Sequence, residues 1–193
     1  MKKRICIVLV VIAMLVPSFA FAQMFDVSLG ATSQVLVRDY GSFNFGDTFG
    51  KINNYNFGAE LRLKLTLVEI DAVGLYSPQQ VLGGSVIHRV MFMPTAGLSF
   101  DIVDVVRLGL GMGPMMSWDF QDGHQYPDMS FGDMFMQAPF WYRATVDFLA
   151  DPVMIGVSYG VPTTFNIKTH DAKGLKPEFE TGMIGISVLY SFL

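Results

Sequence analysis

The chain has 193 residues and a formal net charge of −4, and 51% of its residues are hydrophobic while only 16% are charged. A water-soluble domain usually carries about 25% charged residues, so this composition is unusual for that class. The acidic balance without a basic cluster excludes a typical nucleic-acid-binding protein, and the lone cysteine, Cys6, excludes a disulfide framework.

The first 22 residues have the three regions of a secretory signal peptide. A positive start, Met1 to Arg4, precedes an uncharged apolar run from Ile5 to Val16, and Ala20 and Ala22 supply the small residues before a cleavage site. Twelve apolar residues are too few for a membrane helix, which needs roughly 20. We therefore predict a signal peptide at 1–22, cleavage after Ala22, and one mature domain at 23–193.

The segment from Tyr55 to Leu67 shows the pattern that dominates the rest of the chain. Its odd-numbered residues are apolar or aromatic, and the residues between them are polar, charged or glycine. Neighbouring side chains of a strand point to opposite faces, so this pattern predicts a two-faced β-strand. Its length exceeds the roughly 5–6 residues of an average strand and suits a tilted strand that crosses a bilayer, which needs about 9–11.

Similar alternation recurs along the chain, although the segment around 71–77 is the weakest case. It predicts eight strands, at about 24–37, 55–67, 70–78, 89–100, 105–114, 138–149, 153–162 and 181–192. Short turns are expected at 68–69, 101–104 and 150–152, and long loops at about 38–54, 79–88, 115–137 and 163–180. Short turns at one end and long loops at the other are typical of outer-membrane barrels.

These features predict an all-β protein, an eight-stranded antiparallel up-and-down transmembrane β-barrel that follows a cleaved signal peptide. The polar rows are rich in small residues, which suit the crowded interior of an eight-stranded barrel, and the opposite rows suit lipid. A soluble barrel or sandwich is the alternative, because alternation alone does not separate the two classes.

Aromatic residues fall near both ends of the expected strands, as the two girdles of a membrane barrel do. With a periplasmic N-terminus, one group forms the periplasmic rim: Phe25, Phe100, Phe148, Tyr190 and Phe192. The other group forms the outer rim: Tyr55, Phe57, Tyr76, Phe92, Phe140, Tyr142 and Tyr159.

The export segment, the eight alternating segments and the ending from Ile186 to Leu193 resemble the small bacterial outer-membrane barrels of the OmpX, OmpW and OmpA-transmembrane-domain type. The resemblance implies that Tyr190 and Phe192 form a signal for the barrel-assembly machinery, although Leu193 departs from an aromatic ending. It also implies the outer membrane of a Gram-negative-type bacterium as the location. Likeness to the OmpW-like members would imply a conduit or binding site for small apolar molecules.

Seven charged residues lie on the expected inner rows. They are Glu60, Arg62, Lys64, Asp71, Arg107, Arg143 and Asp147. Charges in so narrow a lumen are costly unless they are paired, so we expect a structural network of ion pairs that fills the barrel. A polar path for small solutes is the alternative reading.

The loops offer contact surfaces and no clear chemistry. The segment 112–137 is rich in methionine and aromatic residues, which predicts an apolar external lobe that dips into the membrane rim or binds an apolar ligand or partner. Its irregular spacing meets no metal-ligand pattern, so we expect no metal and no cofactor. The aromatic loop 39–54 either contacts a partner or folds over the barrel mouth.

The three histidines, His88, His124 and His170, fall in or beside expected loops, with no recognisable serine partner. We therefore predict a non-enzymatic integral outer-membrane protein with a narrow or filled lumen and surface-exposed loops. Its expected partners are outer-membrane lipid, the assembly machinery, and a small apolar ligand or an extracellular partner at the loops. A porin-like, OmpW-like conduit is the first alternative, and a lipid-modifying enzyme is the second.

Overall fold

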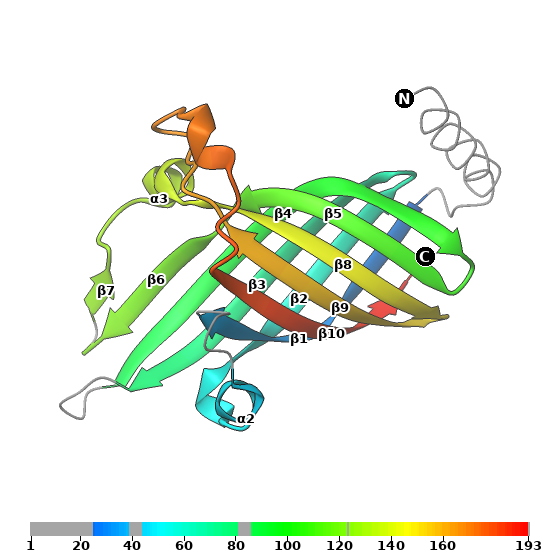
Figure 1. The fold of residues 1–193 in the computed structure, drawn as a ribbon, viewed down its shortest axis with the longest axis horizontal. Coiled ribbons are helices and arrows are strands. Elements are labelled where there is room, and N and C mark those ends of the chain that lie inside the picture. Colours follow the sequence, from blue (N-terminus) through cyan, green and yellow to red (C-terminus); the bar gives the residue numbers. More distant parts are fainter. Residues whose placement is uncertain (1–24, 39–43, 81–85, 123, 193) are drawn as a thin grey trace.

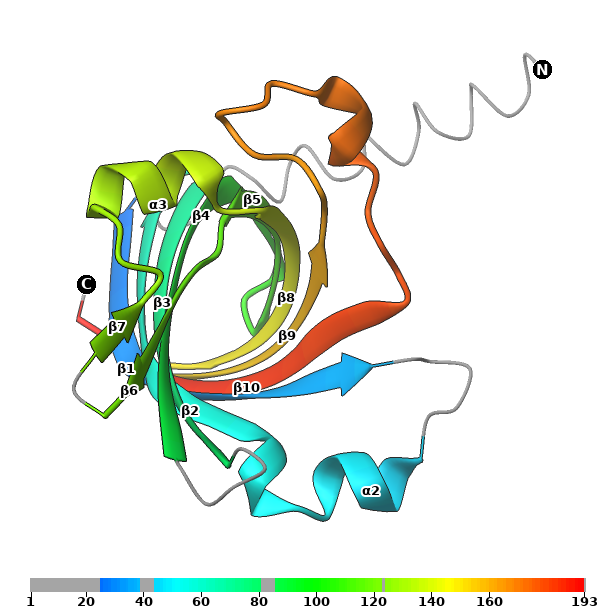
Figure 2. The same cartoon turned by 90° about the vertical axis from the view of Figure 1, so that its left-hand side faces the viewer.

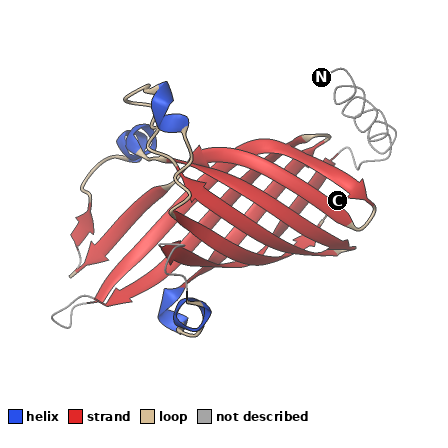
Figure 3. Cartoon of the chain, in the orientation of Figure 1, coloured by secondary structure: helices blue, strands red, loops and turns tan. Residues whose placement is uncertain are grey.

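The structure is a computed structural model that describes residues 25–38, 44–80, 86–122 and 124–192. Strands make up most of the described chain, and its loops contain four short helical segments. Figures 1 and 3 show this arrangement. The strands are β1 (Phe25–Arg38), β2 (Tyr55–Leu65), β3 (Val68–Gln80), β4 (Val86–Val103), β5 (Val106–Pro114), β6 (Met116–Gln121), β7 (His124–Tyr126), β8 (Phe140–Ala150), β9 (Val153–Pro162) and β10 (Thr181–Ser191). The expected signal peptide at 1–22 lies outside the described residues.

Eight of these strands close into an antiparallel barrel in the order β1, β2, β3, β4, β5, β8, β9 and β10, and β10 pairs back onto β1. Each strand pairs with its neighbours along the chain, which is the up-and-down arrangement. Closure leaves no open sheet edge around the wall, so the backbone groups there are paired within the protein. The structure confirms the predicted fold class and the eight strands, including β3, which had the weakest pattern.

The end of the barrel with the tight turns, called the turn end below, also holds the beginning of β1 and the end of β10 (Figure 1). The turns lie at Thr66–Leu67, Asp104–Val105 and Asp151–Pro152. The prediction of a turn at 68–69 was wrong, because the chain reverses two residues earlier at Thr66, which has a φ of 57°. The expected 101–104 turn is also shifted, since β4 continues to Val103.

The opposite end, called the loop end, is built differently from the prediction. Strands β3 and β4 remain paired beyond the expected ends at 78 and 89. Strand β3 continues to Gln80, which pairs with Val86 at the beginning of β4. The expected loop at 115–137 contains β6, which pairs with β4, and β7, which pairs with β6. The helices are α2 (Phe45–Phe49), α3 (Phe131–Gln137) and 3-10 turns at Ile52–Asn54 and Ala172–Leu175.

The outer surface of the barrel is apolar, while its interior holds buried charges, which is the reverse of a soluble barrel. Large aliphatic side chains are exposed all round the wall, among them Leu29, Leu61, Ile70, Leu98, Leu110, Val146, Ile155 and Ile186. Charged side chains from β2, β3, β5 and β8 are buried inside. This inversion identifies the chain as a transmembrane β-barrel. Among the described residues, none of the helices has the length and apolarity to span a bilayer.

Candidate functional site

The middle of the lumen holds a cluster of buried charges centred on Arg62 of β2. Its guanidinium donates to Glu60 Oε1 at 2.7 Å, to Asp71 Oδ1 at 3.0 Å and to a carboxylate oxygen of Asp147. The side chains of Glu60 and Asp147 are fully buried and that of Arg62 is 1% exposed. One cation from β2 therefore ties together carboxylates from β2, β3 and β8 across the lumen.

Arg143 of β8 joins the same cluster from the opposite wall. It donates to Asp71 Oδ2 at 2.7 Å and to Glu60 Oε1 at 2.8 Å, so Glu60 and Asp71 are each shared by two guanidiniums. Glu69 Oε1 lies 3.8 Å from Arg62 Nε. Arginine suits this position because its planar fork serves several carboxylates at once and keeps its charge when buried. The cluster, called the charged layer below, consists of Glu60, Arg62, Glu69, Asp71, Arg143 and Asp147.

A second group of charges lies nearer the turn end. Arg107 of β5 donates to Asp101 Oδ1 and to Asp26 Oδ2, both at 2.7 Å, and the Lys64 ammonium pairs with Asp101. Ser191 donates to Asp26 Oδ1 at 2.8 Å, which ties the last residue of β10 to the beginning of β1. Lys64 and Arg107, two of the predicted lumen residues, therefore share Asp101 and belong to this second group, outside the charged layer.

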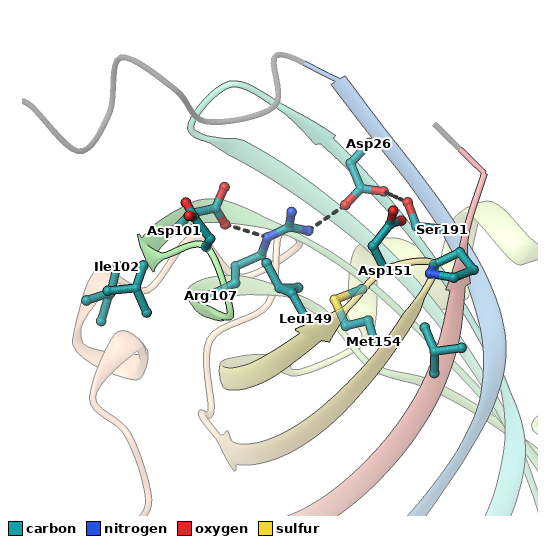
Figure 4. A pocket seen from close by; sticks show the side chains of 12 residues that line it. Asp26, Asp101, Ile102, Arg107, Leu149, Asp151, Met154 and Ser191 are labelled. Carbon is teal, nitrogen blue, oxygen red and sulfur yellow. Dashed lines mark hydrogen bonds and ion pairs between the residues drawn. The ribbon is translucent and has the colours of Figure 1, made fainter.

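This second group borders an open cavity of about 550 Å³ at the turn end. Figure 4 shows Arg107 held between Asp101 and Asp26, with Asp151 and Met154 on the facing side. The rest of the lining consists of Ile102, Val103, Asp104, Leu149, Pro152, Val153 and Ser191. The charges at its floor are already paired, so the cavity is a vestibule that leads to a closed charge network.

Three carboxylates of these networks, Asp26, Glu69 and Asp101, were not among the seven predicted residues. Glu69 and Asp101 were assigned to turns, and Asp26 is the second residue of β1. Each lies two residues from a buried residue of the inner row of its own strand, and therefore on the same face. The pairs are Asp26 with Ser28, Glu69 with Asp71, and Asp101 with Ser99. Extending the alternation by one residue would have found Glu69 and Asp101, whereas Asp26 already lay on the inner row of the strand expected at 24–37.

Glycines on the inner rows create the space that the charges occupy. A Cβ at Gly156 of β9 would collide with Asp147 Oδ1 and would lie 2.7 Å from Ser187 Oγ. A Cβ at Gly109 of β5 would lie 2.9 Å from Glu69 Oε1 and would collide with Thr145 Oγ1. The small residues of the polar rows therefore match the large charged ones across the lumen, as the packing of a narrow barrel requires.

Towards the loop end the lumen changes character and becomes apolar. The side chains that fill it are buried and come from β3, β4, β8 and β10: Val73, Leu75, Met91, Met93, Trp141 and Met183. We call this set the apolar plug. The sequence analysis expected the inner rows to be rich in small and charged residues, and in this half of the barrel they are apolar, because β3 and β4 place apolar residues on both faces.

The predicted periplasmic aromatic rim lies at the turn end of the outer surface. Phe25, Phe148, Tyr190 and Phe192 are about half exposed, and Phe100 is partly exposed. The rings of Tyr190 and Phe192 meet edge to face, with centroids 5.2 Å apart. At the loop end, Phe57 and Tyr76 are exposed on the outer face, whereas Tyr55, Phe140 and Tyr142 contact the folded loops.

His88, one of the three histidines, contacts a tyrosine on the neighbouring strand. Its ring stacks on that of Tyr76, and Tyr76 Oη and His88 Nδ1 lie 2.6 Å apart. Among the described residues, no three His, Cys, Asp or Glu side chains converge as metal ligands would. The arrangement that the lumen does offer is a set of paired charges and packed apolar side chains.

No protein-family model matches the chain, and no curated protein matches it. Among solved structures, the chain is similar to Ail, the attachment invasion locus protein of Yersinia pestis, in a structure with the heparin analogue sucrose octasulfate. The two chains are 15% identical and have a TM-score of 0.47, and the match covers 87% of this chain and 97% of that one. It is also similar to Neisserial surface protein A, at 10% identity and a TM-score of 0.45 over 88% of this chain and 96% of that one.

Proposed function

We propose that this protein is a non-enzymatic outer-membrane barrel with a closed lumen, which works by anchoring its loop-end surface outside the cell. The observation that carries the proposal is the filling of the lumen by two successive layers. The charged layer joins three walls of the barrel through Arg62 and Arg143, and the apolar plug packs above it. A solute would have to displace both.

The paired geometry favours a structural role for the lumen charges over a polar path. A path needs polar groups that exchange a solute for water, whereas Glu60 and Asp71 are each bound by two guanidiniums and are less than a tenth exposed. Breaking such contacts leaves a buried charge without a partner, which is strongly unfavourable. The network thus holds opposite walls of the barrel together.

The proposal includes export and assembly. Residues 1–22 act as a signal peptide, the turn end with both ends of the barrel faces the periplasm, and Tyr190 and Phe192 are recognised by the assembly machinery. The exposed position of both rings at the end of β10 supports this reading. Mass spectrometry of the protein from outer-membrane fractions should give a mature chain that begins at Gln23, and a chain that begins at Met1 would contradict it.

Conductance in a planar bilayer tests the closed lumen. The refolded native barrel should give no stable current, while an open porin in the same bilayer provides the positive control. The variant with both Trp141→Ala and Arg143→Ala removes a large side chain from each layer and should give small, flickering currents. Stable open-channel currents from the native protein, or its uptake of a small apolar solute into vesicles, would overturn the proposal in favour of an OmpW-like conduit.

A further inference from the structure

The loops at the loop end fold outward over the barrel wall. Figure 2, which faces this end, shows α2, α3 and the orange turn at Ala172–Leu175 outside the ring of strands. Figure 1 shows them to the sides of the barrel, with α2 on the opposite side from α3. Of the two readings of loop 39–54, folding over the barrel mouth does not fit its described part, residues 44–54, which lies outside the ring.

The first and the fourth long loop are each held by a tyrosine of the outward-facing row. For the first loop, Tyr55 Oη donates to the carbonyl of Phe49 at the end of α2, at 2.9 Å. Tyr55 belongs to the same row of β2 as Phe57 and Leu61, both exposed on the outer wall. The fourth loop is held in the same way, since Tyr142 Oη donates to the carbonyl of Leu175 at 3.1 Å.

Helix α3 packs on the outer wall through apolar contacts. Its Met134 and the following Ala138 are buried with Met116, against Phe92 and Trp118. Phe92 pairs with Met116 between β4 and β6, so these side chains share one face of the sheet. Phe92 has the same position parity as Leu98, which is exposed on the outer wall, so α3 covers the outward face.

The lobes expose large apolar side chains next to charged ones such as Lys51, Asp133 and Lys173, a mixture that suits the boundary between acyl chains and headgroups. Large exposed side chains occur on every lobe, with exposed fractions of 68% for Ile52, 59% for Phe131 and 63% for Phe179. A water-soluble surface rarely gathers large apolar side chains at one level around a molecule. Here they continue, around the rim, the apolar wall that contacts hydrocarbon.

We propose that these three lobes form a collar that lies in the outer leaflet, at the boundary between lipid headgroups and acyl chains. The collar consists of residues 45–54, 129–137 and 165–179, and its exposed apolar residues insert among the acyl chains. Its occupant is lipid, because the collar is continuous with the lipid-facing wall and encircles it on several sides. Short helices with one apolar side lie at this boundary in the same way, about 5–10 Å into it.

The collar would widen the part of the protein that the membrane holds and fix the loops near the surface. Because the lobes lie outside the ring of strands, the paired strands β3, β4, β6 and β7 are left as the structure that projects beyond the barrel mouth (Figure 1). The inference rests on the proposed membrane embedding of the barrel, so its test must separate the two.

Site-directed spin labelling provides that test, because Cys6 is the only cysteine. In the full chain with Cys6→Ser, single substitutions Ile52→Cys, Phe131→Cys and Phe179→Cys would each carry a nitroxide in refolded, lipid-embedded protein. Oxygen, which concentrates in hydrocarbon, and a water-soluble nickel chelate report the surroundings of each label. Leu110→Cys, in the middle of β5, is the lipid control, and Gln125→Cys, in the exposed strand β7, is the water control.

The collar predicts higher oxygen than nickel accessibility at all three loop positions, between the two controls in depth. A water-like response at these positions together with a lipid-like response at position 110 would overturn the collar and leave the barrel proposal intact. A water-like response at position 110 would overturn both. Protection from both reagents, with intermolecular spin coupling, would show a second copy of the chain on this surface and would also overturn the lipid assignment.

Discussion

The charged layer and the apolar plug fill the same lumen by opposite physical means. In the charged layer, Arg62 and Arg143 are stable inside the barrel only because carboxylates surround them. In the plug, Met93 and Trp141 need no specific partner and are held by close packing and by the exclusion of water. One layer therefore depends on the identity of each side chain, and the other depends mainly on volume.

The difference predicts how each layer responds to substitution. Removing one member of a buried ion network leaves its partners uncompensated, so the loss exceeds the value of the lost contact. Removing part of a methionine from an apolar cluster leaves a gap that neighbouring flexible side chains partly fill. The predictions below run from the substitution with the largest effect to the one with the smallest.

Arg62→Met should have the largest effect. The variant keeps much of the side chain's volume beside Met154 but leaves Asp147 and Glu69 without their guanidinium, and Asp71 and Glu60 with only Arg143. We expect a loss of about 3–5 kcal/mol in the free energy of unfolding, as for other buried pairs that lose one partner. Denaturant unfolding of the lipid-embedded barrel, followed by tryptophan fluorescence, measures it.

Arg62→Lys is the matched comparison, since it keeps the charge and loses the planar fork. It should lie between the native protein and Arg62→Met, because one ammonium cannot serve three carboxylates in the same geometry. Equal stability of Arg62→Met and the native chain would show that the charged layer contributes no specific pairing, and the comparison of the two layers would fail.

Met93→Ala tests the apolar plug. The residue is 2% exposed and packs with the other plug side chains. Its truncation should cost about 2 kcal/mol, at the low end of buried Met→Ala changes, because Met91 and Met183 can move into the space. The variant should remain non-conducting, since the charged layer is intact. A stable channel from this single change would mean that the plug alone closes the lumen.

Much of the fold could be predicted from the sequence, for a physical reason. A strand that separates lipid from a polar lumen must alternate strictly, and Tyr55 to Leu65 does so with one face buried and the other exposed. The parity of Arg62, Arg107 and Arg143 therefore gave their side of the wall. Parity does not give distance across the lumen, so the separation of Arg107 from the charged layer needed the three-dimensional structure.

Two further features were beyond the pattern. The apolar plug has no alternation, because Val73 and Leu75 face inward on strands whose outward residues are also apolar. Both β5 and β6 pair with β4, and the strand is interrupted between them at Met115. The methionine-rich segment after this interruption was therefore expected to be a loop, although it continues the sheet. Both departures lie at the loop end, where the wall leaves the uniform environment of the membrane.

Gly156→Ala tests the space around the charged layer. The added methyl group would collide with Asp147 Oδ1, and Arg62 holds this carboxylate in place through its other oxygen, so we expect a cost of about 1–2 kcal/mol from overpacking. Gly74→Ala in β3 is the control, since its methyl group would have no neighbour within 4 Å. Unfolding of both variants under the same conditions compares them, and equal stability would contradict a tightly packed network.

Arg89→Ala should have the smallest effect, although its ion pair has better geometry than several in the lumen. Arg89 Nε and Nη2 donate to the two carboxylate oxygens of Asp119 at 2.6 and 2.7 Å, between β4 and β6. The two side chains are about 30% exposed, so water screens the charges and solvates whichever one remains. We expect a loss below about 1 kcal/mol, further reduced by added salt.

The same arginine-to-alanine change at position 143 should cost several times more, because neither water nor salt reaches its partners. If the two variants lose equal stability, or respond equally to salt, then solvent reaches the charged layer, and the lumen is more open than its contacts indicate.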